Sequence, residues 1–173
     1  MSLRYELAPS VTPELRDQLL RLWVDVVNAG GAVGFVPPVT TEDVRPELLR
    51  HLTGMAQGSV RLLAAFDEED RVVGTAFFGF NHRLLKRHWV WLYTVMLHPC
   101  RQGRGEGREL LRAAEEAARG MDGIGGIRLT CRGGAGLERF YARCGYEEAG
   151  RVPGALRVAE GDLRDDITMW LPL

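Results

Sequence analysis

The central part of the chain contains a strand, a glycine-rich turn, a helix and a second strand in close succession, and this pattern constrains the fold more than any other. Residues 89–97 are apolar or weakly polar and rich in aromatic and β-branched types, which predicts a strand buried on both faces. A turn rich in glycine and arginine follows at 101–107, and the helix after it is expected to end at Gly120. A short strand at 126–131 completes a βαβ unit, which implies a right-handed crossover and at least one parallel strand pair.

Most of the remaining chain predicts helices and antiparallel strands. Thr12, Pro13 and Glu14 have the residue types of a helix N-cap, a first helical position and an acidic first turn, so a helix is expected over 13–28. A second helix is expected from residue 41 to about residue 55. Further strands are expected at 3–8, 60–66, 72–80, 146–152, 155–159 and 166–171. Because one crossover is embedded among hairpins, the expected class is α+β, with a mixed, mostly antiparallel twisted sheet and flanking helices.

The length and the composition indicate one ordinary globular domain. At 173 residues, with 46% hydrophobic and 26% charged residues, the chain is expected to form a single domain over 1–173. Its 22 basic and 23 acidic residues give a net charge of −1, which argues against general binding to nucleic acid or to an anionic membrane. The sequence shows neither an apolar run of membrane-spanning length nor a signal-peptide pattern, so a cytoplasmic location is expected. The cysteines and histidines share no ligand spacing, so no metal site is expected.

The turn at 101–107 has the composition of an anion-binding site. Glycines before a helix leave backbone N–H groups accessible at its N-terminus, the helix dipole adds about half a positive charge, and missing Cβ atoms permit close approach of a phosphate. Arg104 and Arg108 add formal charge. A P-loop is excluded because its Gly-x-x-x-x-Gly-Lys-Ser/Thr run is missing, and a dinucleotide fingerprint is excluded because its third glycine would fall on Arg108. The alternative is a tight strand-to-helix turn that binds no ligand.

Two short motifs resemble those of the GNAT-type, acetyl-CoA-dependent N-acetyltransferases. The run Gln102-Gly103-Arg104-Gly105-Glu106-Gly107 is similar to their pyrophosphate loop, Gln/Arg-x-x-Gly-x-Gly/Ala, and it follows a hydrophobic-His-Pro sequence as it does in that family. The run at 140–146, Phe-Tyr-Ala-Arg-Cys-Gly-Tyr, is similar to their second landmark, Phe-Tyr-x-x-x-Gly-Phe/Tyr. The motifs and the segments between them span about a third of the chain.

The resemblance implies a binding mode for acetyl-CoA. Backbone amides of the turn would hold the diphosphate, and the end of the preceding strand would hydrogen-bond the pantetheine arm. The implied cofactor-binding residues are Met96, Leu97, Gln102, Gly103, Arg104, Gly105, Glu106, Gly107 and Arg108. Glu106 departs from the family, where this place is usually apolar or small, so its carboxylate has to point away from the phosphates.

Acetyl transfer to an amine needs a neutral nucleophile, stabilisation of an oxyanion and a proton for the departing thiolate. By resemblance, Tyr141 gives the proton and the N–H of Leu97 stabilises the oxyanion, since a phenol with a pKa of ~10 can protonate a thiolate of ~8.5. The proton acceptor for the amine is less evident, because the predicted central strand contains no Asp, Glu or His. Glu138, which would share a helix face with Tyr141, is one candidate, and Glu42 and His98 are others. An amine of low pKa would need no protein base.

The activity that the resemblance implies is transfer of an acetyl group from acetyl-CoA to a primary amine of a small molecule or peptide by direct attack. The loop around Phe35, the second helix with Glu42 and the last hairpin resemble the acceptor walls of the family, so Phe35 and Glu42 are the expected acceptor-binding residues. Dimerisation is common in the family, and a homodimer is compatible with the resemblance. The alternative from another class is a non-catalytic acyl-CoA-binding sensor or structural module, which Glu106 and the missing strand carboxylate motivate.

Overall fold

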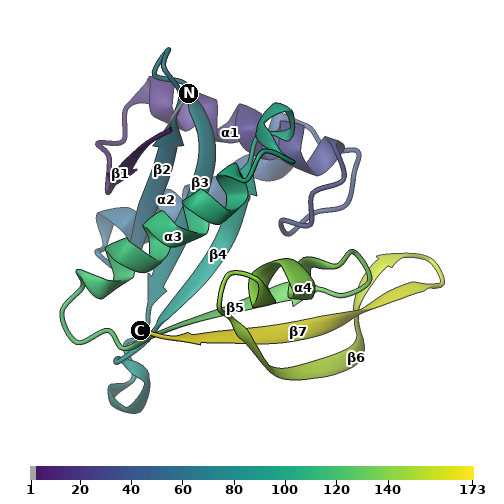
Figure 1. The fold of residues 1–173 in the computed structure, drawn as a ribbon. Helices are drawn as coiled ribbons and strands as arrows, with labels where there is room; N and C mark the ends of the chain where they lie inside the picture. The colour runs from purple at the N-terminus through teal and green to yellow at the C-terminus, as the bar shows by residue number, and fades with distance from the viewer. Residues whose placement is uncertain (1–2) are drawn as a thin grey trace.

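The computed structural model describes residues 3–173, which form a seven-stranded sheet with helices on both faces (Figure 1). The strand order is β1-β2-β3-β4-β5-β7-β6, and within the described residues only β4 and β5 pair in parallel. The strands are β1 (Arg4–Leu7), β2 (Val60–Phe66), β3 (Val72–Phe80), β4 (Val90–Leu97), β5 (Gly126–Arg132), β6 (Glu147–Ala159) and β7 (Asp162–Pro172). The helices are α1 (Pro13–Asn28), α2 (Thr41–Ala56), α3 (Glu106–Arg119) and α4 (Leu137–Ala142), with 3-10 turns η1 (Leu84–Lys86) and η2 (Pro99–Arg101). The predicted α+β class with one parallel crossover is confirmed.

Two hydrophobic cores lie on opposite faces of the sheet. Along β2 and β3 successive side chains alternate between them, because a strand has a side-chain period of two. Leu62 and Phe77 belong to the core beneath α1 and α2, whereas Leu63 and Phe78 belong to the core beneath α3 and α4. Figure 1 shows α3 in front of β2, β3 and β4, with α1 and α2 behind them. The sheet therefore separates the two cores.

Capping residues fix the starts of α1 and α2, and the cap of α1, Thr12, is the one that the sequence predicts. The Leu15 N–H donates to the Thr12 hydroxyl oxygen at 3.1 Å, and α1 occupies the predicted residues 13–28. At the start of α2 the Thr40 N–H donates to the Asp43 carboxylate at 2.8 Å, which is one half of a capping box. No helix within residues 3–173 is long and apolar enough to cross a membrane.

The last hairpin is longer than predicted. The strands expected at 146–152 and 155–159 are one strand, β6, so the prediction of two strands is wrong. Pro153 has no N–H to donate, but β6 is an edge strand of the sheet, where a missing donor is tolerated, and the pairing with β7 shifts register between Val152 and Leu156. The Gly154 N–H instead donates to the Asp165 carboxylate at 3.1 Å.

The central strand β4 separates from its parallel neighbour, and this separation shapes the site. β4 pairs with β5 only at Val90–Ile127 and Trp91–Arg128 within the described residues, and the two strands then diverge (Figure 1). Thr94 has a φ of 48°, and the register between β3 and β4 shifts beside it, as in a β-bulge. The prediction that this strand is buried on both faces is therefore wrong for its middle part, residues 93–95, which is only partly buried.

Candidate active site

The glycine-rich turn between β4 and α3 presents unpaired backbone donors. Gly103 and Gly105 have positive φ angles of 77° and 85°, and Gly105 is the N-cap of α3. In the part of the chain that the structure describes, the amide N–H groups of residues 103–107 donate to no protein acceptor. Gln102 differs, because its N–H donates to the Pro99 carbonyl oxygen at 3.3 Å. Five adjacent free donors at the N-terminus of a 14-residue helix are suited to bind an anion such as a diphosphate.

The turn is fastened to the free edge of β4. The Gln102 side chain donates from Nε2 to the Leu97 carbonyl oxygen at 2.9 Å. The His98 N–H donates to the Val73 carbonyl oxygen on β3 at 2.8 Å, and consecutive N–H groups of a strand point to opposite edges. The Leu97 N–H therefore points away from β3, toward the gap where β5 has separated.

Glu106 is held away from this row of donors. Its carboxylate accepts from the Arg101 guanidinium at 3.1 Å, and the two side chains are only 11% and 15% exposed. Burial, followed by the charges of Glu109 and Glu106, raises the pKa of Tyr5 on β1 to about 12. One Glu106 carboxylate oxygen, Oε1, is thus paired with Arg101, and the other, Oε2, is buried without a hydrogen-bond partner. Arg104 and Arg108 stay exposed at the turn.

On the α1 and α2 side, the gap between β4 and β5 opens into a cleft of about 990 Å³. Its walls come from the loop at 32–36, from α2, and from β4, β5 and β6. Tyr141 of α4 also lines the cleft although it is only 8% exposed. Burial, followed by the nearby Cys131 and Cys144 thiols, raises the pKa of Tyr141 far above its ordinary value. The phenol is therefore protonated at neutral pH.

The cleft combines some of the residues that the sequence singles out and leaves others outside. Phe35 lines it, packs edge-on against Trp23 at 5.8 Å between ring centroids, and its carbonyl oxygen accepts from Arg132 at 3.2 Å. Glu42 and Glu138 do not line it.

The three candidate proton acceptors that lie outside the cleft, Glu42, Glu138 and His98, differ in their surroundings. Glu42 pairs with Arg45 at 2.8 Å on the surface, and this guanidinium lowers the pKa of the Glu42 carboxyl. One carboxylate oxygen of Glu138 is buried without a hydrogen-bond partner. His98 also lies outside the cleft, with Nε2 3.6 Å from the Asp25 carboxylate.

The charged groups that do line the cleft carry both signs. The acidic residues are Asp43, Glu47 and Asp166, and the basic residues are Arg50, Arg132 and Arg157. Asp43 is occupied by the capping box of α2, and Glu47 pairs through Oε2 with the Arg50 guanidinium. Asp166 is the cleft carboxylate that makes no side-chain hydrogen bond or ion pair within residues 3–173. Residues 3–173 contain no group of three or more His, Cys, Asp or Glu side chains that could hold a metal ion.

The structure adds two residues that the sequence interpretation missed, His51 of α2 and Thr94 of β4. Both line the cleft, and the His51 Nε2 lies 3.0 Å from the Thr94 hydroxyl oxygen. A signal for His51 was present, because it follows Val44 and Leu48 at helical spacing on the buried face of α2. The position of Thr94 had no such signal, since a bulge depends on the pairing of the strand with its neighbours.

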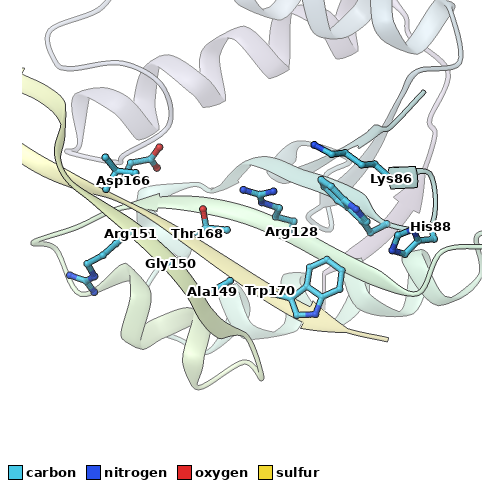
Figure 2. A pocket seen from close by; sticks show the side chains of 11 residues that line it. Lys86, His88, Arg128, Ala149, Gly150, Arg151, Asp166, Thr168 and Trp170 are labelled. Atoms are coloured by element: carbon cyan, nitrogen blue, oxygen red, sulfur yellow. The ribbon is translucent and has the colours of Figure 1, made fainter. Parts of the chain in front are cut away.

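A second groove of about 690 Å³ continues along the same face of the sheet. Asp166 lines both the cleft and this groove, and Figure 2 shows Arg128, Thr168 and Trp170 along its floor on β5 and β7. The Arg128 guanidinium lies 4.6 Å from the centroid of the Trp91 ring and 5.6 Å from that of Trp89. Aromatic and cationic side chains therefore line this groove.

The family of the chain follows from comparison with known proteins. Residues 35–146, which include the turn, β4, β5 and Tyr141, match the model of the acetyltransferase (GNAT) family. Because this match covers more than half of the chain, the protein belongs to the GNAT acetyltransferase family. The resemblance seen in the two short motifs, and the acetyl-CoA-dependent acetyltransferase class that it implied, are confirmed.

Solved structures of other acetyltransferases have the same fold. An acetyltransferase of the GNAT family from Streptococcus pneumoniae has a TM-score of 0.75 at 17% identity, covering 98% of this chain and 100% of that one. A ribosomal-protein-alanine N-acetyltransferase from Brucella melitensis has a TM-score of 0.73 at 23% identity, covering 97% and 99%. A phosphinothricin acetyltransferase from Sinorhizobium meliloti, in complex with acetyl-CoA, has a TM-score of 0.73 at 22% identity, covering 98% and 88%. At these identities the likeness concerns the fold.

Proposed function

We propose that the protein transfers an acetyl group from acetyl-CoA to a primary amine of a small molecule or peptide. The observation that carries this proposal is the separation of β4 from β5 after Trp91. The free amide donors of residues 103–107 lie at one end of this gap. The gap opens into the cleft with Tyr141 on the α1 and α2 side of the sheet. An amine in the cleft could reach the thioester of an acetyl-CoA molecule in the gap while the diphosphate of this acetyl-CoA stays on the turn.

The cofactor would be held mainly by backbone groups. The amides of 103–107 bind the diphosphate, and the exposed Arg104 and Arg108 add positive charge beside it. The pantetheine arm follows the free edge of β4 at Met96 and Leu97. Gln102 contributes through its side chain, which holds the Leu97 carbonyl oxygen, since its own N–H is bonded to Pro99.

The transfer itself needs three groups at the gap. The neutral amine attacks the thioester carbonyl carbon, a C–N bond forms, and the Leu97 N–H stabilises the oxyanion. The oxyanion then collapses, the C–S bond breaks, and the Tyr141 hydroxyl gives its proton to the departing sulfur. Burial weakens Tyr141 as an acid, but the same burial raises the pKa of a thiolate beside it, so the transfer stays feasible.

The acceptor would carry a cationic amine before it reacts. Glu47 and Asp166 line the cleft and attract an ammonium group. Glu47 pairs with Arg50 through one carboxylate oxygen, and it lines the cleft, whereas Glu138 does not. We therefore propose Glu47, through water, as the proton acceptor in preference to Glu138. Asp166 leads from the cleft into the second groove, which would hold the remainder of a peptide or another extended acceptor.

The proposal is tested with the purified chain, acetyl-CoA and a panel of primary amines that includes amino acids, polyamines, aminoglycosides and peptides with free N-termini. Release of free CoA together with an acetylated product of the expected mass supports it. Acetyl-CoA binding without acetylation of any amine would contradict it and favour a binding module.

A further inference from the structure

Thr94 is held in an unusual backbone conformation at the edge of the cleft. Its φ of 48° lies in the left-handed region, which β-branched residues rarely adopt because the branched Cβ crowds the backbone. Such conformations persist where surrounding contacts enforce them, and they gather at functional sites. Two contacts do so here. The Thr75 hydroxyl donates to the Thr94 carbonyl oxygen at 2.9 Å, and the Thr94 hydroxyl lies 3.0 Å from His51 Nε2.

The direction of the second contact follows from the other ring nitrogen of His51. Nδ1 lies 2.9 Å from the Glu47 carbonyl oxygen, and a carbonyl oxygen can only accept, so Nδ1 carries the proton. A neutral imidazole has a single N–H, and Nε2 is therefore an acceptor. The Thr94 hydroxyl has to donate to it.

The His51 ring is neutral at working pH. It is 6% exposed and packs edge-on against Trp23, Phe77 and Tyr93, with centroid distances of 5.2, 4.7 and 5.0 Å. Burial, followed by the charge of Arg50, lowers the pKa of His51 to about 4.

The groups around the ring do not reverse this state. α1 and β3 contribute Trp23 and Phe77, which carry no titratable group, and β4 contributes Tyr93, a neutral phenol whose pKa burial raises to about 12. Glu47 lies 3.6 Å from Nδ1 on α2 itself. A ring of such low basicity is a poor proton acceptor for an amine but a permanent hydrogen-bond acceptor for Thr94.

We propose that His51 and Thr94 position the acceptor amine: His51 takes the only hydroxyl proton of Thr94, so that the oxygen faces the cleft with lone pairs alone and accepts an N–H of the incoming amine. The amine then keeps its own lone pair free for the thioester carbon, since its N–H is turned toward Thr94. Thr94 contacts the substrate, and His51 is a positioning residue that acts through it. This inference rests on the proposed acetylation of an amine, and it explains how β4 can serve that reaction without a carboxylate.

The tautomer of His51 is the direct test, and it needs no acceptor. In 15N spectra of the imidazole nitrogens of the labelled whole chain, the His51 signals are assigned by their loss in His51→Phe. Protonated Nδ1 and unprotonated Nε2, unchanged from pH 8 to pH 5.5, are expected. A proton on Nε2, or a charged ring at pH 6, overturns the inference whether or not the enzyme acetylates amines.

Kinetics with an amine found in the panel give the second test. Thr94→Val keeps the shape of the side chain and removes the oxygen, so kcat/KM for the amine should fall on the order of 10-fold. The Kd for acetyl-CoA should stay within about twofold, and Thr94→Ser should restore most of the rate. Thr53→Val, at an exposed threonine of α2, is the matched control and should behave as wild type.

Each outcome of the kinetic test decides one point. A Thr94→Val enzyme with unchanged amine kinetics, or one that loses acetyl-CoA binding and amine turnover together, overturns the positioning role. Wild-type protein that acetylates no amine contradicts the proposed function instead, and the 15N spectra then still decide the direction of the hydrogen bond.

Discussion

The turn at one end of the gap between β4 and β5 and the cleft into which this gap opens are built in different ways. The turn at 103–107 offers five main-chain donors from consecutive residues, and its one acid, Glu106, is paired internally with Arg101. The cleft is instead made of side chains from α2, α4 and several strands and loops, and its lining includes Asp166 and the Glu47–Arg50 ion pair. A backbone site of this kind suits a cofactor of constant structure, whereas a side-chain site can change with the acceptor.

The largest effect is expected for Tyr141, which lines the cleft, in comparison with the neighbouring Tyr146, which does not. Tyr141→Phe removes the proposed proton donor, so kcat should fall by about 10³-fold while the Kd for acetyl-CoA is kept. Tyr146→Phe is the matched control, because the Tyr146 hydroxyl is buried without a partner and its ring lies 5.7 Å from that of Tyr141. An unchanged rate in Tyr141→Phe would remove this residue from the mechanism.

The difference between the turn and the cleft also explains what the sequence could predict. The turn and the helix that follows it depend on local sequence, so Gln102 to Gly107 could be recognised from their order alone. Phe35 and Tyr141 are predicted as site residues through resemblance, and the cleft includes both. His51 and Thr94 are 43 positions apart and meet only because α2 packs on β4, so neither residue reveals its partner in the sequence. The long β6 was missed for a similar reason, since Pro153 reads as a break unless the strand is known to lie at the edge.

The second prediction tests whether the turn acts through its backbone. Gly105→Val places a β-branched side chain at φ 85° beside the free amides, and it should weaken acetyl-CoA binding about 100-fold, measured by calorimetry. Gly58→Val is the control, because Gly58 has a φ of 73° and, like Gly105, nothing within 4 Å of its added Cβ, but it lies after α2. Both variants should lose similar stability. Equal loss of acetyl-CoA binding in the two would show that strain, rather than the blocked amides, is responsible.

The third prediction concerns the internal pair beneath the turn. Arg101→Met leaves the largely buried Glu106 carboxylate without its partner, so the free energy of unfolding should fall by about 2 kcal/mol. Adding Glu106→Gln should recover most of this loss in a double-mutant cycle measured by urea unfolding. If the double variant is as unstable as Arg101→Met, the carboxylate was not stabilised by Arg101, and the separation of this acid from the phosphate site has another cause.

The smallest expected effect is the pH dependence of stability that the buried His51 ring of the cleft causes. The folded pKa of His51, about 4, lies below its ordinary value of 6.5, so the unfolded chain binds this proton more readily. Stability should therefore fall as the pH drops below 6.5, and by pH 5.5 the ring should have cost about 1 kcal/mol relative to pH 7.5. His51→Phe lacks this titration, so its urea midpoint should fall less over the same range. Equal pH dependence in the two proteins would mean that His51 is not buried as a neutral ring, and the fixed direction of the Thr94 hydroxyl would lose its physical basis.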